Sequence, residues 1–122
     1  MIYTISKSFA FEAAHRLPQH RGKCRRLHGH SYRVEVAISG VLQSSGPSQG
    51  MIMDFDELSL VVRPLLAALD HHYLNRLFDR PPTAEHIASC LAEGIARQLP
   101  SGVRLAHVRV YETLTSYAEA RP

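Results

Sequence analysis

A strand-like run that begins with His28-Gly29-His30 constrains this chain more than any other part of its sequence. In extended backbone the side chains alternate between two faces, so the two histidines point the same way. Four apolar residues continue their parity: Tyr32, Val34, Val36 and Ile38. Gly29 leaves room for another backbone or a ligand to approach closely. The run therefore predicts a strand over residues 28–42, whose apolar face carries two histidines at its start.

A second alternating segment, residues 2–15, predicts a neighbouring antiparallel strand that ends in His15. Its inward face is formed by Tyr3, Ile5, Phe9, Phe11 and Ala13. The loop of residues 16–27 would then bring His15 beside His28 and His30. A catalytic zinc takes three protein ligands and keeps one position open. One such histidine alone is more often an ordinary polar residue near a loop, but three on one face favour a metal site.

Two helices and two further strands are expected in the rest of the chain. Asp54 is a good N-cap for an amphipathic helix, with apolar residues at three- and four-residue spacings. Thr83 caps a second helix, and residues 103–112 and 115–120 resemble strands. The order ββααββ predicts an α+β fold, a four-stranded antiparallel sheet with two helices on one face. Alone, such a sheet has open edges and an apolar face that is only partly covered.

The composition is that of an ordinary globular protein. With 122 residues, of which 45% are hydrophobic and 20% charged, we expect a single domain spanning residues 1–122. No run approaches the roughly 20 apolar residues that cross a membrane. The N-terminus lacks a signal-peptide pattern, so we expect a cytoplasmic protein without a membrane partner.

The two cysteines are expected to be free thiols with different roles, because cytosolic proteins rarely form disulfides. Cys90 flanks an apolar helical stripe and is predicted to be a small core residue. Cys24 stands four residues before His28, between Lys23 and the pair Arg25-Arg26. Positive charge favours the thiolate, which makes Cys24 a candidate catalytic base.

The net charge is +3, and the basic residues are scattered along the chain except for a group in one loop. Its basic residues are Arg16, Arg21, Lys23, Arg25 and Arg26. No helix carries a basic stripe and no RNA-binding aromatic motif is present, so we expect no nucleic-acid partner. A basic loop beside a metal site suits a phosphorylated small molecule, although a merely solvated loop is an open alternative.

Several short motifs occur in a characteristic order. They are Phe11-Glu12-Ala13-Ala14-His15, Cys24-x-x-x-His28-Gly29-His30, Leu69-Asp70-His71-His72-Tyr73-Leu74-Asn75, Pro82-Thr83-Ala84-Glu85 and Val110-Tyr111-Glu112-Thr113. Over nearly the whole chain this resembles the 6-pyruvoyl-tetrahydropterin synthase family, and most of all its bacterial 6-carboxy-5,6,7,8-tetrahydropterin synthase branch. The resemblance implies the T-fold, or tunnelling fold. In that fold three subunits close their sheets into a barrel and two trimers stack, so we expect a homotrimer or homohexamer.

The resemblance also implies roles for individual residues. Zn²⁺ would be held by His15, His28 and His30. Cys24 would act as general base, His71 would relay protons, and Asp70 would orient His71. Without these roles, Asp70 would be a helix-end cap and His71 a surface histidine. His72 is not expected to carry the proton. Substrate would be bound by Glu112, Thr83, Lys23 and Arg26, of which Glu112 would anchor the pterin ring. Many relatives have a small polar residue after this threonine, but Ala84 stands here.

The implied reaction is zinc-dependent conversion of 7,8-dihydroneopterin triphosphate to 6-carboxy-5,6,7,8-tetrahydropterin, acetaldehyde and triphosphate, in the synthesis of queuosine precursors. One alternative is formation of 6-pyruvoyl-tetrahydropterin without carbon–carbon cleavage. Another is a non-catalytic zinc- or pterin-binding module, which would not need Cys24 or Asp70-His71. The spacing between Cys24 and His28 is shorter than in the animal pyruvoyl-forming enzymes, which favours cleavage.

Overall fold

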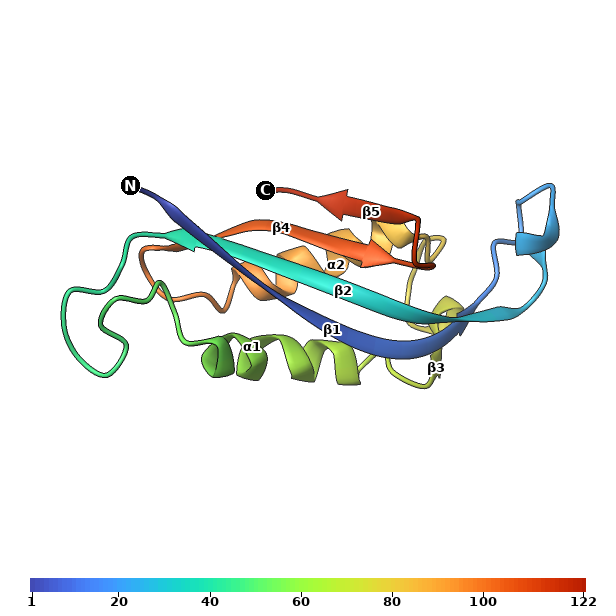
Figure 1. The fold of residues 1–122 in the computed structure, drawn as a ribbon. Helices are drawn as coiled ribbons and strands as arrows, with labels where there is room; N and C mark the ends of the chain where they lie inside the picture. The colour runs from blue at the N-terminus through green and yellow to red at the C-terminus, as the bar shows by residue number, and fades with distance from the viewer.

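The computed structural model describes residues 1–122 and shows a twisted sheet with two helices packed on one face (Figure 1). Two short 3₁₀ turns, Lys23–Arg25 and Leu74–Arg76, lie in the connections. The elements in chain order are β1 (Tyr3–His15), β2 (His28–Gly40), α1 (Phe55–Ala67), β3 (His72–Tyr73), α2 (Ala84–Ala96), β4 (Val103–Tyr111) and β5 (Tyr117–Ala120). This confirms the α+β class and the placement of both helices.

The sheet is mixed and five-stranded, in the order β3-β1-β2-β4-β5, so the expected four-stranded antiparallel sheet was wrong. The additional strand, β3, pairs parallel to the end of β1 through Ala13 with His72 and Ala14 with Tyr73. A two-residue strand has no alternation that a sequence pattern can reveal. β3 matters because it attaches the segment after α1 to the end of β1.

The pairing of β1 with β2 decides where the three histidines meet. The two strands are antiparallel, with His15 opposite His28 and Ala13 opposite His30. Side chains with the same parity on paired strands lie on one face of the sheet. His15, His28 and His30 therefore share the helix-facing side of the sheet, as the alternation predicts.

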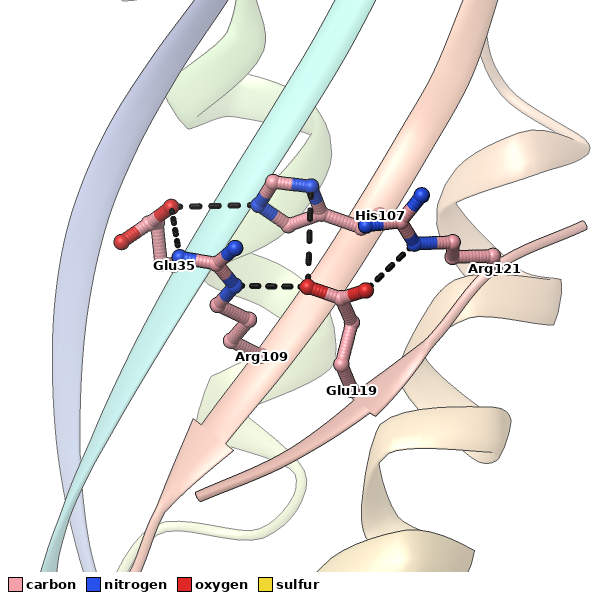
Figure 2. Close-up of polar contacts among 5 residues, drawn as sticks. All are labelled: Glu35, His107, Arg109, Glu119 and Arg121. Atoms are coloured by element: carbon pink, nitrogen blue, oxygen red, sulfur yellow. Dashed lines mark hydrogen bonds and ion pairs between the residues drawn. The ribbon is translucent and has the colours of Figure 1, made fainter. Parts of the chain in front are cut away.

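Burial follows the alternation along each long strand. The inward residues of β2, from Tyr32 to Ile38, are fully buried beneath the helices, and Leu58, Val62, Ile87 and Ile95 cover them. The opposite face of the sheet is not covered by a helix. It carries a polar network across β2, β4 and β5, formed by Glu35, His107, Arg109, Glu119 and Arg121 (Figure 2).

Both predicted N-caps are present, but the predicted burial of Cys90 was wrong. The Asp54 carboxylate accepts a hydrogen bond from the backbone N–H of Asp56, and the Thr83 hydroxyl accepts one from that of His86. Cys90 is an exposed, free thiol. Ala88 and Ala92 widen the buried stripe of α2 on the side away from Cys90. The spacing of the apolar residues along α2 did not reveal which flank of the buried stripe is covered, the flank with the alanines or the flank with Cys90.

Neither helix has the length and apolar character needed to cross a lipid bilayer.

Candidate functional site

Three histidine side chains converge at the ends of β1 and β2 that meet the basic loop. The nitrogens that His15, His28 and His30 offer all lie within 4.8 Å of one another, and Nε2 of His15 is 3.1 Å from Nε2 of His30. Donor nitrogens around a tetrahedral zinc, at Zn–N distances of 2.0–2.1 Å, are roughly 3.3 Å apart. The cluster therefore has nearly the size that a zinc ion requires.

The hydrogen bonds of the rings orient two of these histidines as metal ligands. Nδ1 of His15 lies 2.8 Å from the backbone oxygen of Pro82, and Nδ1 of His28 lies 2.8 Å from that of Arg26. A carbonyl oxygen only accepts, so each Nδ1 carries the hydrogen and each Nε2 keeps its lone pair. Metal-ligating histidines are held in the same way. The donor set thus fits a metal ion in chemistry as well as in size.

The surroundings of His30 favour its neutral form. Burial lowers the pKa of His30, and the neighbouring rings of His15 and His28 lower it further, while the Glu112 carboxylate acts in the opposite direction. A neutral imidazole offers a lone pair to a metal. Oε2 of Glu112 lies 3.8 Å from Nε2 of His30, so this carboxylate borders the histidine cluster.

A pocket of about 540 Å³ adjoins the cluster and contains three carboxylates. Its lining includes Thr83, Glu85, Glu112 and Glu119. Glu119 is bound by Arg109, at 2.7 Å, and by Arg121 (Figure 2), which together lower its pKa to about 2. Glu112 has no arginine partner. Glu112, on the side of the pocket next to the histidines, can therefore accept hydrogen bonds from a bound ligand.

The predicted base, Cys24, is not part of the histidine cluster. It is a half-buried free thiol in the loop between β1 and β2, and its sulfur is not among the grouped metal-binding atoms. The same loop forms an open cavity of about 780 Å³. The cavity is lined by Arg16, Arg21, Gly22, Lys23, Arg25, Arg26 and Leu27. The predicted basic residues are therefore gathered around one hollow.

Asp70 and His71 form a close pair just before β3, on the side of β1 away from β2. Oδ2 of Asp70 lies 2.9 Å from Nδ1 of His71, and Oδ1 accepts a 2.8 Å hydrogen bond from the N–H of Glu12. This N–H and His71 lower the pKa of Asp70. His71 has φ +58°, an unusual conformation for a residue other than glycine, and its N–H donates to the Glu12 carbonyl.

Neither Asp70 nor His71 is among the residues whose donor atoms form the histidine cluster, although His71 and His30 both line one pocket of about 500 Å³. The contacts of the pair with Glu12 are to its main-chain N–H and carbonyl. The structure thus brings together His15, His28, His30 and Glu112, with Thr83 in the adjoining pocket. Cys24, Asp70 and His71 are not part of this group.

Sequence reasoning missed two groups that contact His15. One is the backbone oxygen of Pro82, which is buried; the other is the hydroxyl of Tyr32, 3.3 Å from Nδ1 of His15. Pro82 lies 67 residues from His15 in the chain, and a main-chain acceptor leaves no mark on residue type. Tyr32 resembled an ordinary core aromatic because it continues the apolar parity of β2.

Comparison with known proteins gives a consistent result. The family described as 6-pyruvoyl tetrahydropterin synthase matches residues 4–122. A Synechocystis protein named 6-carboxy-5,6,7,8-tetrahydropterin synthase is 47% identical over 121 residues, which cover 96% of this chain and 92% of the relative. A Haemophilus influenzae protein of the same name is 35% identical over 141 residues, covering 97% of this chain and 98% of the relative.

A solved structure agrees with these matches. The 6-pyruvoyl tetrahydropterin synthase of Caenorhabditis elegans superposes with a TM-score of 0.86 at 26% identity, covering 100% of this chain and 96% of that one. Family match, identity and fold extend over the same nearly complete length. The chain therefore belongs to the 6-pyruvoyl tetrahydropterin synthase family, in its branch of enzymes named 6-carboxy-5,6,7,8-tetrahydropterin synthase.

Proposed function

We propose that the chain converts 7,8-dihydroneopterin triphosphate and water to 6-carboxy-5,6,7,8-tetrahydropterin, acetaldehyde and triphosphate, with zinc as its metal. The observation that carries this proposal is the group of three imidazoles with Glu112 beside it. The names of the relatives support the choice of substrate and product. We further propose that the reaction takes place in the cytoplasm and supplies queuosine-precursor synthesis.

His15, His28 and His30 would hold the zinc through their Nε2 atoms, since two of them use Nδ1 for backbone carbonyls. When bound, zinc supplies Lewis-acid chemistry at the two hydroxyls of the substrate side chain. The main-chain carbonyls of Pro82 and Arg26 orient two of these ligands before any metal arrives.

Glu112 would anchor the pterin ring. A pterin presents two neighbouring N–H groups that resemble one edge of guanidine, and a carboxylate can accept from both. Thr83 would line the same pocket from the start of α2. Because Glu119 is already paired with arginines, we assign the ring to Glu112.

The basic cavity would bind the triphosphate. Lys23 and Arg26 line it, and a polyphosphate is the most highly charged part of the substrate. Cations there would also stabilise the negative charge that develops on the leaving triphosphate.

Cys24 would act as the base, with His71 moving protons and Asp70 orienting His71 through their 2.9 Å contact. Since neither Asp70 nor His71 belongs to the histidine cluster of its own chain, we propose that two copies share each site. The homotrimeric barrel of the T-fold, or a hexamer of two such barrels, would supply the second copy and cover the open sheet edges.

The main alternative stops before carbon–carbon cleavage and releases 6-pyruvoyl-tetrahydropterin, the activity in the name of the Caenorhabditis elegans protein. A non-catalytic zinc or pterin module would need neither Cys24 nor Asp70-His71. Purified protein should be incubated with dihydroneopterin triphosphate, with mass spectrometry of the pterin and an acetaldehyde assay. Acetaldehyde with the carboxylated pterin supports the proposal, whereas the pyruvoyl pterin alone, or no turnover, supports one of the alternatives.

A further inference from the structure

Tyr32 lies beneath the histidine cluster and is completely buried. Its ring stacks on Phe11 with centroids 4.7 Å apart and an angle of 6° between the planes. It also meets His15 and His30 edge-on, at centroid distances of 6.0 and 5.3 Å. Its hydroxyl oxygen lies 3.3 Å from Nδ1 of His15. A core aromatic side chain thus ends in a polar atom placed against a proposed metal ligand.

The hydrogen-bond arrangement assigns a role to that oxygen. Nδ1 of His15 carries the hydrogen because the Pro82 carbonyl lies 2.8 Å away. The Tyr32 oxygen, at the longer distance, is therefore a second acceptor for the same N–H. No other hydrogen bond involves this hydroxyl, so its own hydrogen is buried without an acceptor. A phenylalanine would fill the same space without that cost, so the hydroxyl requires an explanation other than packing.

We propose that Tyr32 is a positioning residue of the proposed zinc centre, and that its hydroxyl oxygen shares the His15 Nδ1–H with the Pro82 carbonyl. The inference rests on the proposed function, because it concerns the same metal. A dication bound to Nε2 withdraws electrons from the imidazole and makes its Nδ1–H a stronger donor. A second acceptor on that hydrogen therefore stabilises the zinc-loaded site more than the metal-free site.

The test is Tyr32→Phe, which keeps the ring that stacks on Phe11 and removes only the hydroxyl. Zinc affinity is measured by competition with a chelator, and the Tm of the metal-free protein by thermal unfolding. We expect zinc to bind about 3- to 10-fold more weakly, below the roughly 10- to 100-fold typical of losing such a contact, because the Pro82 carbonyl remains. The Tm of the metal-free protein should be unchanged or higher, because the substitution removes the Tyr32 O–H, a buried donor that has no acceptor.

A matched control is Ser59→Ala, which removes another buried hydroxyl, one that is bonded to Lys7 and to the Phe55 carbonyl on α1. It should leave zinc affinity unchanged. A second measurement is the NMR signal of the His15 Nδ1–H in the zinc-loaded protein, which should move in Tyr32→Phe and stay in Ser59→Ala. A purely structural role for Tyr32 would lower the metal-free Tm and leave zinc affinity as it was.

Equal zinc affinity in the wild-type and Tyr32→Phe proteins would overturn this inference and leave the proposed function standing. A Tyr32→Phe chain that fails to fold would also overturn it, since the hydroxyl would then serve the fold. A wild-type protein that binds no zinc would overturn both this inference and the metal in the proposed function.

Discussion

At the scale of single residues, the histidine cluster depends on what each ring does with its second nitrogen. His15 and His28 donate from Nδ1 to main-chain oxygens, so the tautomer with a free Nε2 is set before any ligand binds. A ligand that is already oriented loses little conformational freedom when the metal arrives. Burial lowers the pKa of His30 and so favours the neutral form, which can bind a metal.

We predict that the wild-type protein purifies with about one zinc ion per chain, and that His15→Ala, His28→Ala and His30→Ala each lose most of it. Two remaining ligands do not hold zinc in a site of this kind. Metal content of the purified variants, measured by mass spectrometry, checks this. His86→Ala is the control, because the His86 ring also contacts a main-chain carbonyl, that of Pro81, but lies outside the cluster. Full zinc occupancy in all three variants would remove the assignment.

The second residue-scale prediction concerns the pocket. Glu112→Gln should weaken substrate binding by about 10- to 100-fold, the effect of losing charged hydrogen bonds, and should leave zinc content unchanged. The Michaelis constant and the metal content are the measurements. Glu85→Gln is the matched control, since Glu85 lines the same pocket without bordering the histidines. Equal effects of both substitutions would show that Glu112 is not the anchor.

At the scale of elements, a network of ion pairs crosses the open face of β2, β4 and β5. Arg109 connects Glu35 on β2 with Glu119 on β5, at 3.6 and 2.7 Å, and His107 lies 3.1 Å from Glu35 (Figure 2). β5 is only four residues long, so these contacts add to the few main-chain bonds that keep it on the sheet.

This network leads to a prediction about acid stability. The pKa of Glu119 falls from 4.5 to about 2 in the folded chain, so its stabilising effect is complete above pH 4.5 and disappears as the pH falls towards about 2. Glu119→Gln should lower the Tm at neutral pH, and the deficit should narrow as the pH drops below 4.5. Thermal unfolding across this range measures it. Glu93→Gln, at an exposed carboxylate without an ion pair, should show no such trend. A deficit that does not change with pH would rule out the ion pairs as its cause.

At the scale of the whole molecule, the proposed catalytic groups do not form one cluster within one chain. The three histidines share the helix-facing side of the sheet, Cys24 lies in the 3₁₀ turn of the loop that projects beyond the sheet (Figure 1), and His71 is hydrogen-bonded to the main-chain carbonyl of Glu12. Groups that must exchange protons have to come within hydrogen-bond reach of one substrate. Association of copies is the arrangement that we propose to achieve this.

We predict that Cys24→Ala and His71→Ala are each nearly inactive, while co-expression of the two restores part of the activity. If a site takes Cys24 from one copy and His71 from another, random mixing leaves about a quarter of the sites intact. Turnover of the purified mixed oligomer measures this, with zinc content as a check on folding. Co-expression of two differently tagged Cys24→Ala chains is the control. Mixed oligomers without recovered activity would contradict a shared site.

Much of the site could be predicted because strand alternation is a local rule. The parity of residues 2–15 and 28–42 placed His15, His28 and His30 on one face, and the structure brings them together. Cys90 shows the limit of such reasoning, since a helical stripe does not reveal which flank is covered. β3 shows another limit, because two residues carry no pattern.

The sequence by itself determined the alternation, the caps at Asp54 and Thr83, and the family, because each depends on residue types at short and regular spacings. Only the tertiary structure decided that β3 joins the sheet, that Glu119 is neutralised by arginines while Glu112 is not, and that Pro82 and Tyr32 meet Nδ1 of His15. These contacts join residues far apart in the chain or involve main-chain atoms. Such contacts arise from packing the whole chain, and no local pattern records them.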